Sequence, residues 1–597
     1  MPALGTSVAS GAGSQPVIAQ YFGIFHCTRS AEEFKAIVNA APFGACNLLL
    51  LAFVHTVKSP DPDGGYIAQF NNGREPPCPP GKPPDSDKER VALVINRARA
   101  LNPTIKILLS LGYDPGDLGN AAATPSQFAD SVARLVQDNV LDGFDIDYET
   151  PDGVTAEQLV VLVDALKASL GKVTPKRDMI VTITPAPSLG PAKIALETFT
   201  YVMPQYYEGV PARDDDWYAK QLGSFDRIVY GLDCELPPYK DPIAYAVPAR
   251  ANGTAGLFGW RLDNEDLFIY AVKMRRLMAN GALLSSTADT TGPWQWNPIP
   301  TVDQPASWID VSCAGTGRGL QAVAVGSDFG LWATTCFGNG NWLPMYDVRQ
   351  FVSGGPPAFS RVACGSADGK SLQVVGLGSD GDIYLAIRDA EGRWIPEFSK
   401  SPPLQGSDAT IDVACTGSKQ GLRVVAINQS KFLWLTTWHL DSNTWDEFTV
   451  IPLNPGQPYT FAHVACAATP KELHIVACGQ VALPDPPPNP LPPRDPSVVL
   501  WHRVRDVKGN WQPYQKVKDL EPSCPAQVVY AACVFIREEL HVVAAATDYS
   551  LWHSIRDADG KWQPFQCVAP QARPNFVSLS CGTWDEQSFQ VVGVRAA

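Results

Sequence analysis

The first 280 residues alternate short, β-rich apolar runs with stretches of helical periodicity, a pattern typical of repeated βα units. Near-continuous apolar runs fit strands of a parallel sheet that is covered on both faces. The runs lie at 17–25, 46–54, 105–113, 142–149, 179–187, 199–208, 227–235 and 256–263, and helical segments include 126–139, 156–170 and 264–280. Eight strands are the number that closes a parallel barrel. We therefore predict an α/β (β/α)8 TIM barrel over residues 17–280, after a loose tail at residues 1–16.

The fourth run, LDGFDIDYET at 141–150, places four carboxylates in an apolar frame. Asp145, Asp147 and Glu149 alternate at a spacing of two, so on a strand their side chains share one face. Crowded, buried acids must share protons and hydrogen bonds, which pushes their pKa values apart and keeps one of them protonated near neutral pH. Two alternatives to a catalytic role are a calcium-binding loop and a solvated acidic strand edge. A calcium loop would place glycine and oxygen ligands in a turn, which this β-rich segment does not resemble. The segment predicts catalysis, and no metal or cofactor is expected.

The four acids from Asp142 to Glu149 also have the form D-G-x-D-x-D-x-E, and on this motif the chain resembles glycoside hydrolase family 18, the family of chitinases and endo-N-acetylglucosaminidases. The resemblance implies that Glu149, at the C-terminal end of the fourth strand, is the proton donor. It implies that Asp147 orients the substrate acetamide and that Asp145 and Asp142 support it. It further implies a retaining mechanism in which the substrate's own acetamide oxygen attacks the anomeric carbon.

The same resemblance assigns residues at the ends of other strands, where barrel enzymes hold their chemistry. The segment MPQYYE at 203–208 is similar to the family pattern M-x-Q-x-Y-N. It implies that Tyr207 hydrogen-bonds the acetamide oxygen and that Gln205 and Met203 line the site. Glu208 departs from the family's Asn or Asp and alters the charge beside that sugar.

Three aromatic residues match positions that the family uses for sugar contact. Trp260 matches the tryptophan that forms the floor of the −1 subsite, where an indole ring packs on the apolar face of a sugar. Tyr21 and Phe53 match sugar-facing aromatics, and the alternative for each is a place in the barrel core.

The third run departs from the family in one position. The family's S-x-G-G reads SLGY at 110–113, so that Ser110 and Gly112 are kept and Tyr113 replaces the second glycine. Glycine permits close backbone approach, and a tyrosine there would narrow the cleft or add a stacking surface.

Residues 281–597 repeat with a period of about 50 residues. In each repeat a V-x-C strand precedes an L-x-V-V-A-like strand, and a third strand begins with L-W and leads through a glycine turn to a second tryptophan. The V-x-C cysteines are Cys313, Cys364, Cys415, Cys466, Cys533 and Cys581. The segment 282–296 aligns with 550–564, which would complete the last unit from both ends and remove an exposed edge. We predict that an all-β, six-bladed β-propeller over 281–597 follows the barrel in this multidomain chain.

The repeated Trp and Arg residues, such as Arg388, Arg505 and Arg556, resemble those of sugar-binding propeller lectins, in which clefts between blades hold ligand. A second glycan on the propeller is therefore a candidate partner. The alternatives are that the tryptophans form blade cores while the arginines pair with adjacent aspartates, and that the propeller is a protein-docking scaffold.

Composition limits the other partners. The formal net charge of −14 argues against nucleic acid, and the longest apolar run, 48–54, is far too short to cross a membrane. The first 16 residues lack the basic start and apolar core of a signal peptide. The repeated cysteines would lie a blade apart, and disulfides need Cα atoms within roughly 7 Å. Free thiols favour the cytoplasm or export without a cleaved signal, with secretion as the alternative.

These features together predict an endo-acting glycosidase that cleaves β-1,4-linked N-acetylglucosamine polymers such as chitin. An endo-β-N-acetylglucosaminidase acting on N-glycans is the alternative enzyme, and a non-hydrolytic chitin-binding lectin is the alternative without catalysis. Gln205 with Tyr207 favours the chitinase among the two enzymes.

Overall fold

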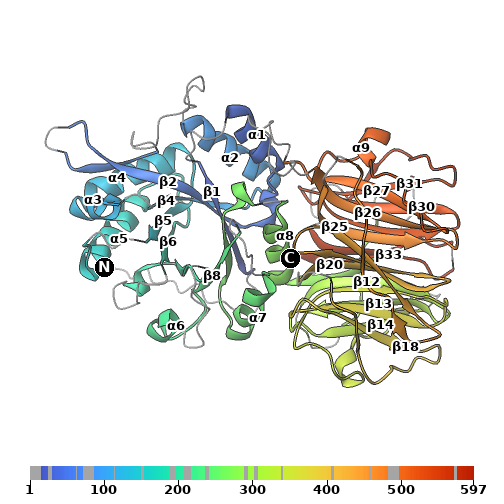
Figure 1. The fold of residues 1–597 in the computed structure, drawn as a ribbon. Helices are drawn as coiled ribbons and strands as arrows, with labels where there is room; N and C mark the ends of the chain where they lie inside the picture. Colours follow the sequence, from blue (N-terminus) through green and yellow to red (C-terminus); the bar gives the residue numbers. More distant parts are fainter. Residues whose placement is uncertain are drawn as a thin grey trace. The chain divides into compact units, whose positions relative to one another are not determined.

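The structure is a computed structural model, and the residues it describes fall into ranges with gaps between them. They are 15–24, 30–61, 64–70, 87–112, 115–149, 153–186, 195–207, 217–234, 241–265, 267–287, 294–301, 305, 307–337, 340–404, 409–455, 459–481, 496–569, 575–585 and 587–596. The chain divides into two compact units, Met1–Asp266 and Leu267–Ala597 (Figure 1).

The first unit is built on one parallel sheet. Its strands are β1 (Val17–Gly23), β2 (Leu48–Lys58), β4 (Lys106–Leu111), β5 (Gly143–Tyr148), β6 (Ile180–Pro185), β7 (Tyr201–Val202), β8 (Val229–Asp233) and β9 (Gly256–Trp260). They pair in the order β7-β6-β5-β4-β2-β1-β9-β8, and a parallel bridge between Val202 and Ile228 brings the two ends of this order together. Each predicted run overlaps one strand, so the prediction of a (β/α)8-like barrel is confirmed. The short β3 (Tyr66–Gln69) pairs antiparallel with the end of β2.

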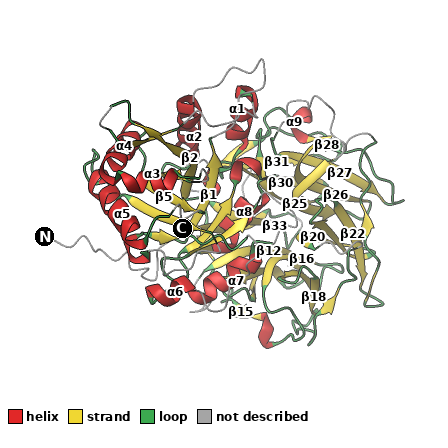
Figure 2. Ribbon diagram, turned by 60° about the vertical axis from the view of Figure 1, so that its left-hand side comes forward, coloured by secondary structure: helices red, strands yellow, loops and turns green. Residues whose placement is uncertain are grey.

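Helices lie along the outside of this sheet (Figure 2). They are α1 (Ala31–Ala40), α2 (Asp87–Leu101), α3 (Asp117–Ala123), α4 (Pro125–Asp138), α5 (Ala156–Leu170), α6 (Trp217–Leu222) and α7 (Ile243–Asn252), with 3-10 turns at Phe43–Ala45, Leu196–Thr198 and Leu262–Asn264. Helix α5 begins with a reciprocal cap, in which the Thr155 hydroxyl accepts from the Gln158 N–H and the Gln158 side chain accepts from the Thr155 N–H. The Phe128 ring of α4 packs 5.9 Å from the Phe144 ring of β5. The apolar stripes of the helices thus cover the outer faces of the strands.

Helix α8 (Ile269–Met278) belongs to the second unit, although its sequence pattern continues the series of barrel helices. It packs against strands β12 and β33. The Arg276 Nη1 donates to the Ser360 carbonyl at 2.6 Å and lies 3.6 Å from Asp310 Oδ1. Its neighbour Lys273 donates to the Ile411 carbonyl at 3.4 Å. These cations tie the helix to three different parts of the second unit.

The second unit is a propeller-like arrangement of small antiparallel sheets. Four are separate: β16 (Phe359–Gly365), β17 (Leu372–Gly378), β18 (Ile383–Arg388) and β19 (Ser399–Lys400); β20 (Thr410–Ser418), β21 (Gly421–Asn428), β22 (Leu433–His439), β23 (Thr444–Trp445) and β24 (Thr449–Val450); β25 (Tyr459–Ala468), β26 (Glu472–Val481), β27 (Val499–Asp506) and β28 (Gln515–Lys516); β29 (Val528–Ile536), β30 (Glu539–Ala546), β31 (Leu551–Arg556) and β32 (Gln566–Ala569). A 3-10 turn at Val348–Gln350 and the short helix α9 (Val517–Leu520) lie in loops between the strands of this unit.

The remaining strands form a single eight-stranded sheet, so the prediction of six separate blades is wrong and four blades stand alone. Its members are β10 (Gly281–Thr287), β11 (Asn297–Pro298), β12 (Trp308–Thr316), β13 (Gly319–Gly326), β14 (Leu331–Cys336), β15 (Tyr346–Asp347), β33 (Phe576–Gly582) and β34 (Gln590–Ala596). The merger occurs because β10 pairs with β12 at Gly281 and Trp308. On its other side β10 pairs with β34 from Gly281–Ala596 to Thr287–Gln590. The predicted pairing of the first strand of the repeat region with the last is confirmed.

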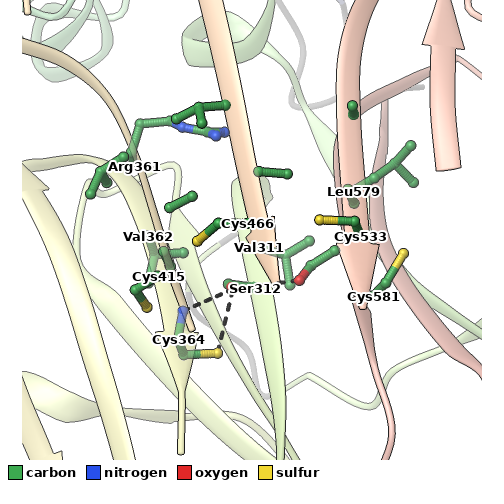
Figure 3. A pocket seen from close by; sticks show the side chains of 18 of the residues that line it. Val311, Ser312, Arg361, Val362, Cys364, Cys415, Cys466, Cys533, Leu579 and Cys581 are labelled. Carbon is green, nitrogen blue, oxygen red and sulfur yellow. Dashed lines mark hydrogen bonds between the residues drawn. The ribbon is translucent and has the colours of Figure 1, made fainter. Parts of the chain in front are cut away.

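The V-x-C strands β12, β16, β20, β25, β29 and β33 surround a pocket of about 70 Å³, and all six repeated cysteines line it (Figure 3). The Ser312 hydroxyl accepts from the Cys364 N–H at 3.0 Å. All cysteines in the described ranges are free thiols and all but Cys567 are buried, as predicted. Burial raises the pKa of Cys313 to about 12, so these thiols are poor nucleophiles.

Three residues before each of these cysteines, polar side chains bind one another across neighbouring sheets. The Arg361 guanidinium bridges Asp310 at 2.8 Å and Asp412 at 2.6 Å. The His463 Nδ1 lies 2.7 Å from Asp412 Oδ2, and the Ser578 hydroxyl donates to Asp310 Oδ1 at 2.6 Å. Burying a charge costs less free energy when an opposite charge lies beside it, as it does here. Such pairs also favour the arrangement in which these particular side chains are in contact. The network therefore fixes the order of the sheets at this end of the pocket.

Candidate active site

Strand β5 presents its acids and its apolar residues on opposite faces. Asp145 and Asp147 alternate with Phe144, Ile146 and Tyr148, and the aromatic ring of Phe144 packs on helix α4. The acids therefore face the interior of the barrel. In the pairing of strands, Asp145 stands opposite Ser110 of β4 and Thr182 of β6.

Asp145 is fully buried and is the acceptor for four hydroxyl groups. Tyr21 and Ser110 donate to Oδ2 at 2.8 and 2.6 Å, and Thr182 and Thr184 donate to Oδ1 at 2.6 and 3.2 Å. Burial raises the pKa of Asp145, while these hydrogen bonds lower it, and burial has the larger effect. Burial and the neighbouring Asp145 also raise the pKa of Tyr21. Asp145 consequently holds a proton more readily than an exposed aspartate does.

Asp147 and Glu149 share one hydrogen-bond donor. The Gln205 Nε2, which follows β7, lies 2.8 Å from Asp147 Oδ1 and 3.3 Å from Glu149 Oε1. Asp147 and Gln205 are buried, whereas Glu149 is half-buried at the strand end. A Cβ atom at Gly112 would stand 2.6 Å from Asp147 Cβ, so the glycine is required for this close approach. The acids thus form a graded series from a buried aspartate to a solvent-accessible glutamate.

Aromatic rings pack together at the same end of the barrel. The Trp260 ring lies 5.2 Å from Tyr21, edge to face, and stacks 5.9 Å from Phe53. Tyr21, Phe53 and Met203 are buried members of one apolar cluster. Trp260 and Tyr207 are half-buried and pack against that cluster. Only the latter two of these residues offer ring surface to a ligand.

Asp142 is not brought together with the other acids. Its carboxylate lies 3.3 Å from Lys106 Nζ and 3.6 Å from Arg99 Nη2, and it accepts from the Ile107 N–H at 3.1 Å. The cause is its odd spacing of three from Asp145, which on a strand turns a side chain to the opposite face. The predicted site residues Tyr113 and Glu208 lie outside the described residues.

Sequence reasoning missed Thr182 and Thr184, which supply two of the four donors to Asp145. A signal for them exists in the run MIVTITPAP, where two hydroxyl residues at a spacing of two interrupt an apolar strand. Within the described ranges, no group of three or more His, Cys, Asp or Glu side chains has the arrangement of a metal site. No helix of the described part is both long and apolar enough to span a membrane.

Comparison with known proteins places the acidic strand inside a matched family region. Residues 17–206 match the model of Glycosyl hydrolases family 18. "Chitinase B" of Serratia marcescens is 31% identical over 106 residues, which cover 15% of this chain and 21% of that protein. "Endochitinase" of Brugia malayi is 33% identical over 97 residues, which cover 15% of this chain and 19% of that protein. The chain thus spans about a fifth of the length of these curated relatives.

Among solved structures, a class V chitinase of Nicotiana tobaccum in complex with NAG4 aligns over 44% of this chain and 98% of its own, with 11% identity and a TM-score of 0.34. The resemblance of the first unit to glycoside hydrolase family 18, expected from the D-G-x-D-x-D-x-E motif, is confirmed by the family match over 17–206.

Proposed function

We propose that the first unit is a glycoside hydrolase that cleaves β-1,4-linked N-acetylglucosamine polymers within the chain, by a retaining mechanism. The observation that carries this proposal is the series Asp145, Asp147, Glu149, in which Gln205 joins the last two through one amide group. The match of this segment to a glycosidase family supports the same reaction class.

In the proposed mechanism, Glu149 donates its proton to the glycosidic oxygen, because it is the acid of the series with access to solvent. The acetamide oxygen of the bound sugar attacks the anomeric carbon while the bond from that carbon to the protonated glycosidic oxygen breaks, so that the other part of the polymer leaves as an alcohol. Asp147 accepts a hydrogen bond from the acetamide N–H. Tyr207 binds the acetamide oxygen. Ionised Glu149 then takes a proton from the incoming water. Neighbouring carboxylates repel each other when both are ionised, so the pair favours the state in which one holds a proton.

The test replaces Glu149 with glutamine, which keeps the shape of the side chain and removes the acidic proton. We expect hydrolysis of N-acetylglucosamine oligomers to fall by at least about 10²–10⁴-fold while oligomer binding is kept. Glu157→Gln, at an exposed position in the first turn of α5, is the matched control and should retain full activity. Turnover of Glu149→Gln at the rate of the unaltered protein would refute the proton-donor role.

Two further measurements separate this proposal from its alternatives. The first measurement compares chitin oligomers with a high-mannose glycoprotein. Cleavage at internal bonds of the oligomers, with no cleavage of the glycoprotein, would indicate the polymer substrate and not N-glycans. A first product in the β-anomeric form, detected by NMR, is required by attack of the acetamide, and an initial α-anomer contradicts it. Binding of oligomers without any cleavage would favour a non-hydrolytic lectin.

For the second unit, we propose that the four separate sheets and the eight-stranded sheet together form one closed ring. The strands β12, β16, β20, β25, β29 and β33 lie beside one another in this order, and β33 returns to β12. The pair Gly281–Trp308 joins β10 to β12 within the large sheet, and the Ser580 hydroxyl of β33 accepts from the Cys313 N–H of β12 at 3.1 Å. This arrangement supports repeated junctions between neighbouring sheets as ligand sites.

A glycan-binding role for these junctions is the accompanying proposal. Trp332 and Trp501, the first tryptophans of their repeats, are buried and serve packing. Trp394 is half-buried and donates through Nε1 to the Tyr346 hydroxyl at 3.1 Å, across two sheets. We expect the full-length Glu149→Gln protein to bind a glycan array, and Trp394→Ala to reduce that binding. If the protein binds N-acetylglucosamine oligomers and no other glycan on the array, that result contradicts a separate lectin function.

A further inference from the structure

One junction in the second unit brings two arginines together. The second residue of each L-x-V-V-A-like strand is polar, and these residues are Gln321, Gln373, Arg423, His474, His541 and Gln590. Gln321 and Arg423 meet an arginine of the next sheet. The position that meets them at the end of the third strand holds arginine in three sheets: Arg388, Arg505 and Arg556. Arginine therefore stands opposite arginine only where β21 precedes β27.

The equivalent junction at β13 and β18 gives the geometry of this meeting. There the Arg388 Nη1 donates to Gln321 Oε1 at 2.6 Å and lies 3.2 Å from Thr335 Oγ1. The two positions are thus within hydrogen-bond reach across neighbouring sheets. Arg423 occupies the position equivalent to Gln321, and Arg505 occupies the position equivalent to Arg388. Gln321 accepts a hydrogen bond from its arginine, whereas Arg423 places a second positive charge beside Arg505.

The Arg423 guanidinium is buried, and no acid of the described ranges forms an ion pair with it. The residue is 7% exposed, and its side chain donates through Nη2 to Gln420 Oε1 at 2.8 Å. Its Nε is buried and has no hydrogen-bond partner in the described structure. Burial, followed by the nearby Arg505, lowers the pKa of Arg423. A buried, unpaired charge is among the most costly features of a folded chain.

Strand β27 carries two arginines beside Trp511, and one of them, Arg505, is the cation near Arg423. The Arg505 Nε donates to the Gly509 carbonyl at 3.3 Å, which fixes the guanidinium over the turn. The Arg503 and Arg505 guanidinium groups lie 5.1 and 5.7 Å from the centre of the Trp511 ring. Arg503 donates to the Gln512 carbonyl at 2.6 Å and to the Pro452 carbonyl. None of Arg423, Arg503 and Arg505 forms an ion pair with an acid in the described ranges.

The other junctions with arginine have no such excess. Arg388 meets the neutral Gln321. Arg556 meets His474 together with Glu472, whose carboxylate lies 3.0 Å from His474 Nε2 and attracts Arg556. The chain as a whole carries a net charge of −14. The meeting of Arg423 with Arg505 is therefore a local exception, and not a consequence of composition.

We propose that the junction of Arg423 and Arg505 binds an oxyanion: the carboxylate, sulfate or phosphate group of a small ligand. A guanidinium presents parallel N–H donors that match the two oxygens of such a group. The anion supplies the missing counter-charge and an acceptor for Arg423. The half-buried Trp511 beside it offers a ring face to the rest of the ligand. This site is independent of the acids in the first unit.

The test measures anion binding to the full-length protein by calorimetry. The probes are inorganic phosphate, inorganic sulfate and glucuronate, with glucose as the neutral control and sodium chloride at equal ionic strength as the salt control. We expect oxyanions to bind to the unaltered protein. Arg423→Gln should weaken this binding by at least about tenfold, because the parallel N–H donors of the Arg423 guanidinium are lost. The substitution copies the pair Gln321–Arg388 found in the same unit. Arg393→Gln, at an exposed arginine paired with Asp389, should leave binding unchanged.

A stability measurement guards against a variant that fails to fold. In chloride buffer Arg423→Gln should melt at the same or a higher temperature than the unaltered protein, since a buried unpaired charge is removed. Phosphate should raise the melting temperature of the unaltered protein and not that of the variant.

The outcomes separate the sources of the anion. Glucuronate binding about tenfold tighter than phosphate identifies an acidic saccharide as the ligand class, and equal or weaker binding identifies a free inorganic oxyanion. The proposal is overturned if no probe binds beyond the chloride control, or if Arg423→Gln binds the probes as tightly as the unaltered protein.

Discussion

Acidification should destabilise the second unit through buried histidine pairs. His541 of β30 and His553 of β31 are each 5% exposed, and the His541 Nδ1 lies 3.2 Å from the His553 Nε2. One ring must donate to the other, so a proton added to the accepting nitrogen breaks the bond. Their other neighbours are the aromatic rings of Phe589 and Trp294, which offer no counter-charge.

The pKa shifts give the size of the effect. Burial lowers the pKa of His541 to about 4, and burial with the neighbouring His541 lowers the pKa of His553 to about 3. An unfolded histidine titrates near about 6.5, so below that pH the unfolded chain takes up protons that the folded chain refuses. At pH 5 each histidine costs about 2 kcal/mol of unfolding free energy relative to pH 8, or roughly 4 kcal/mol for the pair. The loss continues until the pH reaches the folded-state values.

Urea unfolding at pH 8 and pH 5 measures this loss, with tryptophan fluorescence as the probe. All but two of the 16 tryptophans, Trp217 and Trp260, lie in the second unit. The double variant His541→Gln, His553→Leu copies Gln373 and Leu385, the equivalent residues of β17 and β18. We expect the drop between the two pH values to be smaller in the variant by roughly 4 kcal/mol.

The second pair, His474 with His502, is present in both proteins and cancels in the comparison. Burial lowers the pKa of both of its members as well, so the variant should keep part of the acid sensitivity. An equal drop in the two proteins would refute the assignment to the first pair.

Two further predictions follow from contacts in each unit. Gly112→Ala places a Cβ 2.6 Å from Asp147 Cβ, so hydrolysis of N-acetylglucosamine oligomers should fall at least about tenfold, and activity unchanged within a factor of two would contradict the required close approach. A fragment of residues 267–597 should fold with a higher melting temperature than one of 281–597, because only the longer one keeps the hydrogen bond from Arg276 to the buried Ser360 carbonyl, and a hydrogen bond from a charged group contributes about 1.5–3 kcal/mol. Scanning calorimetry compares the two fragments, and equal melting temperatures would show that α8 is dispensable.

Much of the barrel could be read from the sequence because its signals are local. Each strand is a short apolar run, and the alternation of acids at 145, 147 and 149 follows from the two-residue period of a strand. The same period, applied strictly, separates Asp142 from the other acids, since its spacing from Asp145 is odd. The hydroxyl groups that bind Asp145 come from strands far apart in sequence, and no local pattern specifies that Tyr21 reaches it across the barrel.

The second unit was harder to predict where the outcome depended on pairing between distant segments. The repeat identifies the strands, but whether a sheet stays separate depends on contacts such as that of Gly281 with Trp308. Helix α8 has the sequence period of a barrel helix. Its place in the second unit depends on the contacts of Arg276 with Asp310 and Ser360, which the sequence pattern does not reveal. Arginine at 423 was visible in the sequence, yet only the packing of neighbouring sheets reveals that it lacks a counter-charge.

The pairing of β10 with β34 has a consequence for how the protein is made. Thr287 and Gln590, which meet in this pairing, are separated by 303 positions. Closing a loop of that length costs about 5 kcal/mol in chain entropy. At synthesis rates of about 5–20 residues per second, the ribosome needs on the order of tens of seconds to deliver the second partner after the first. During that interval the edge of β10 is open to other chains. A message that ends early therefore yields a protein in which β10 lacks its pairing with β34.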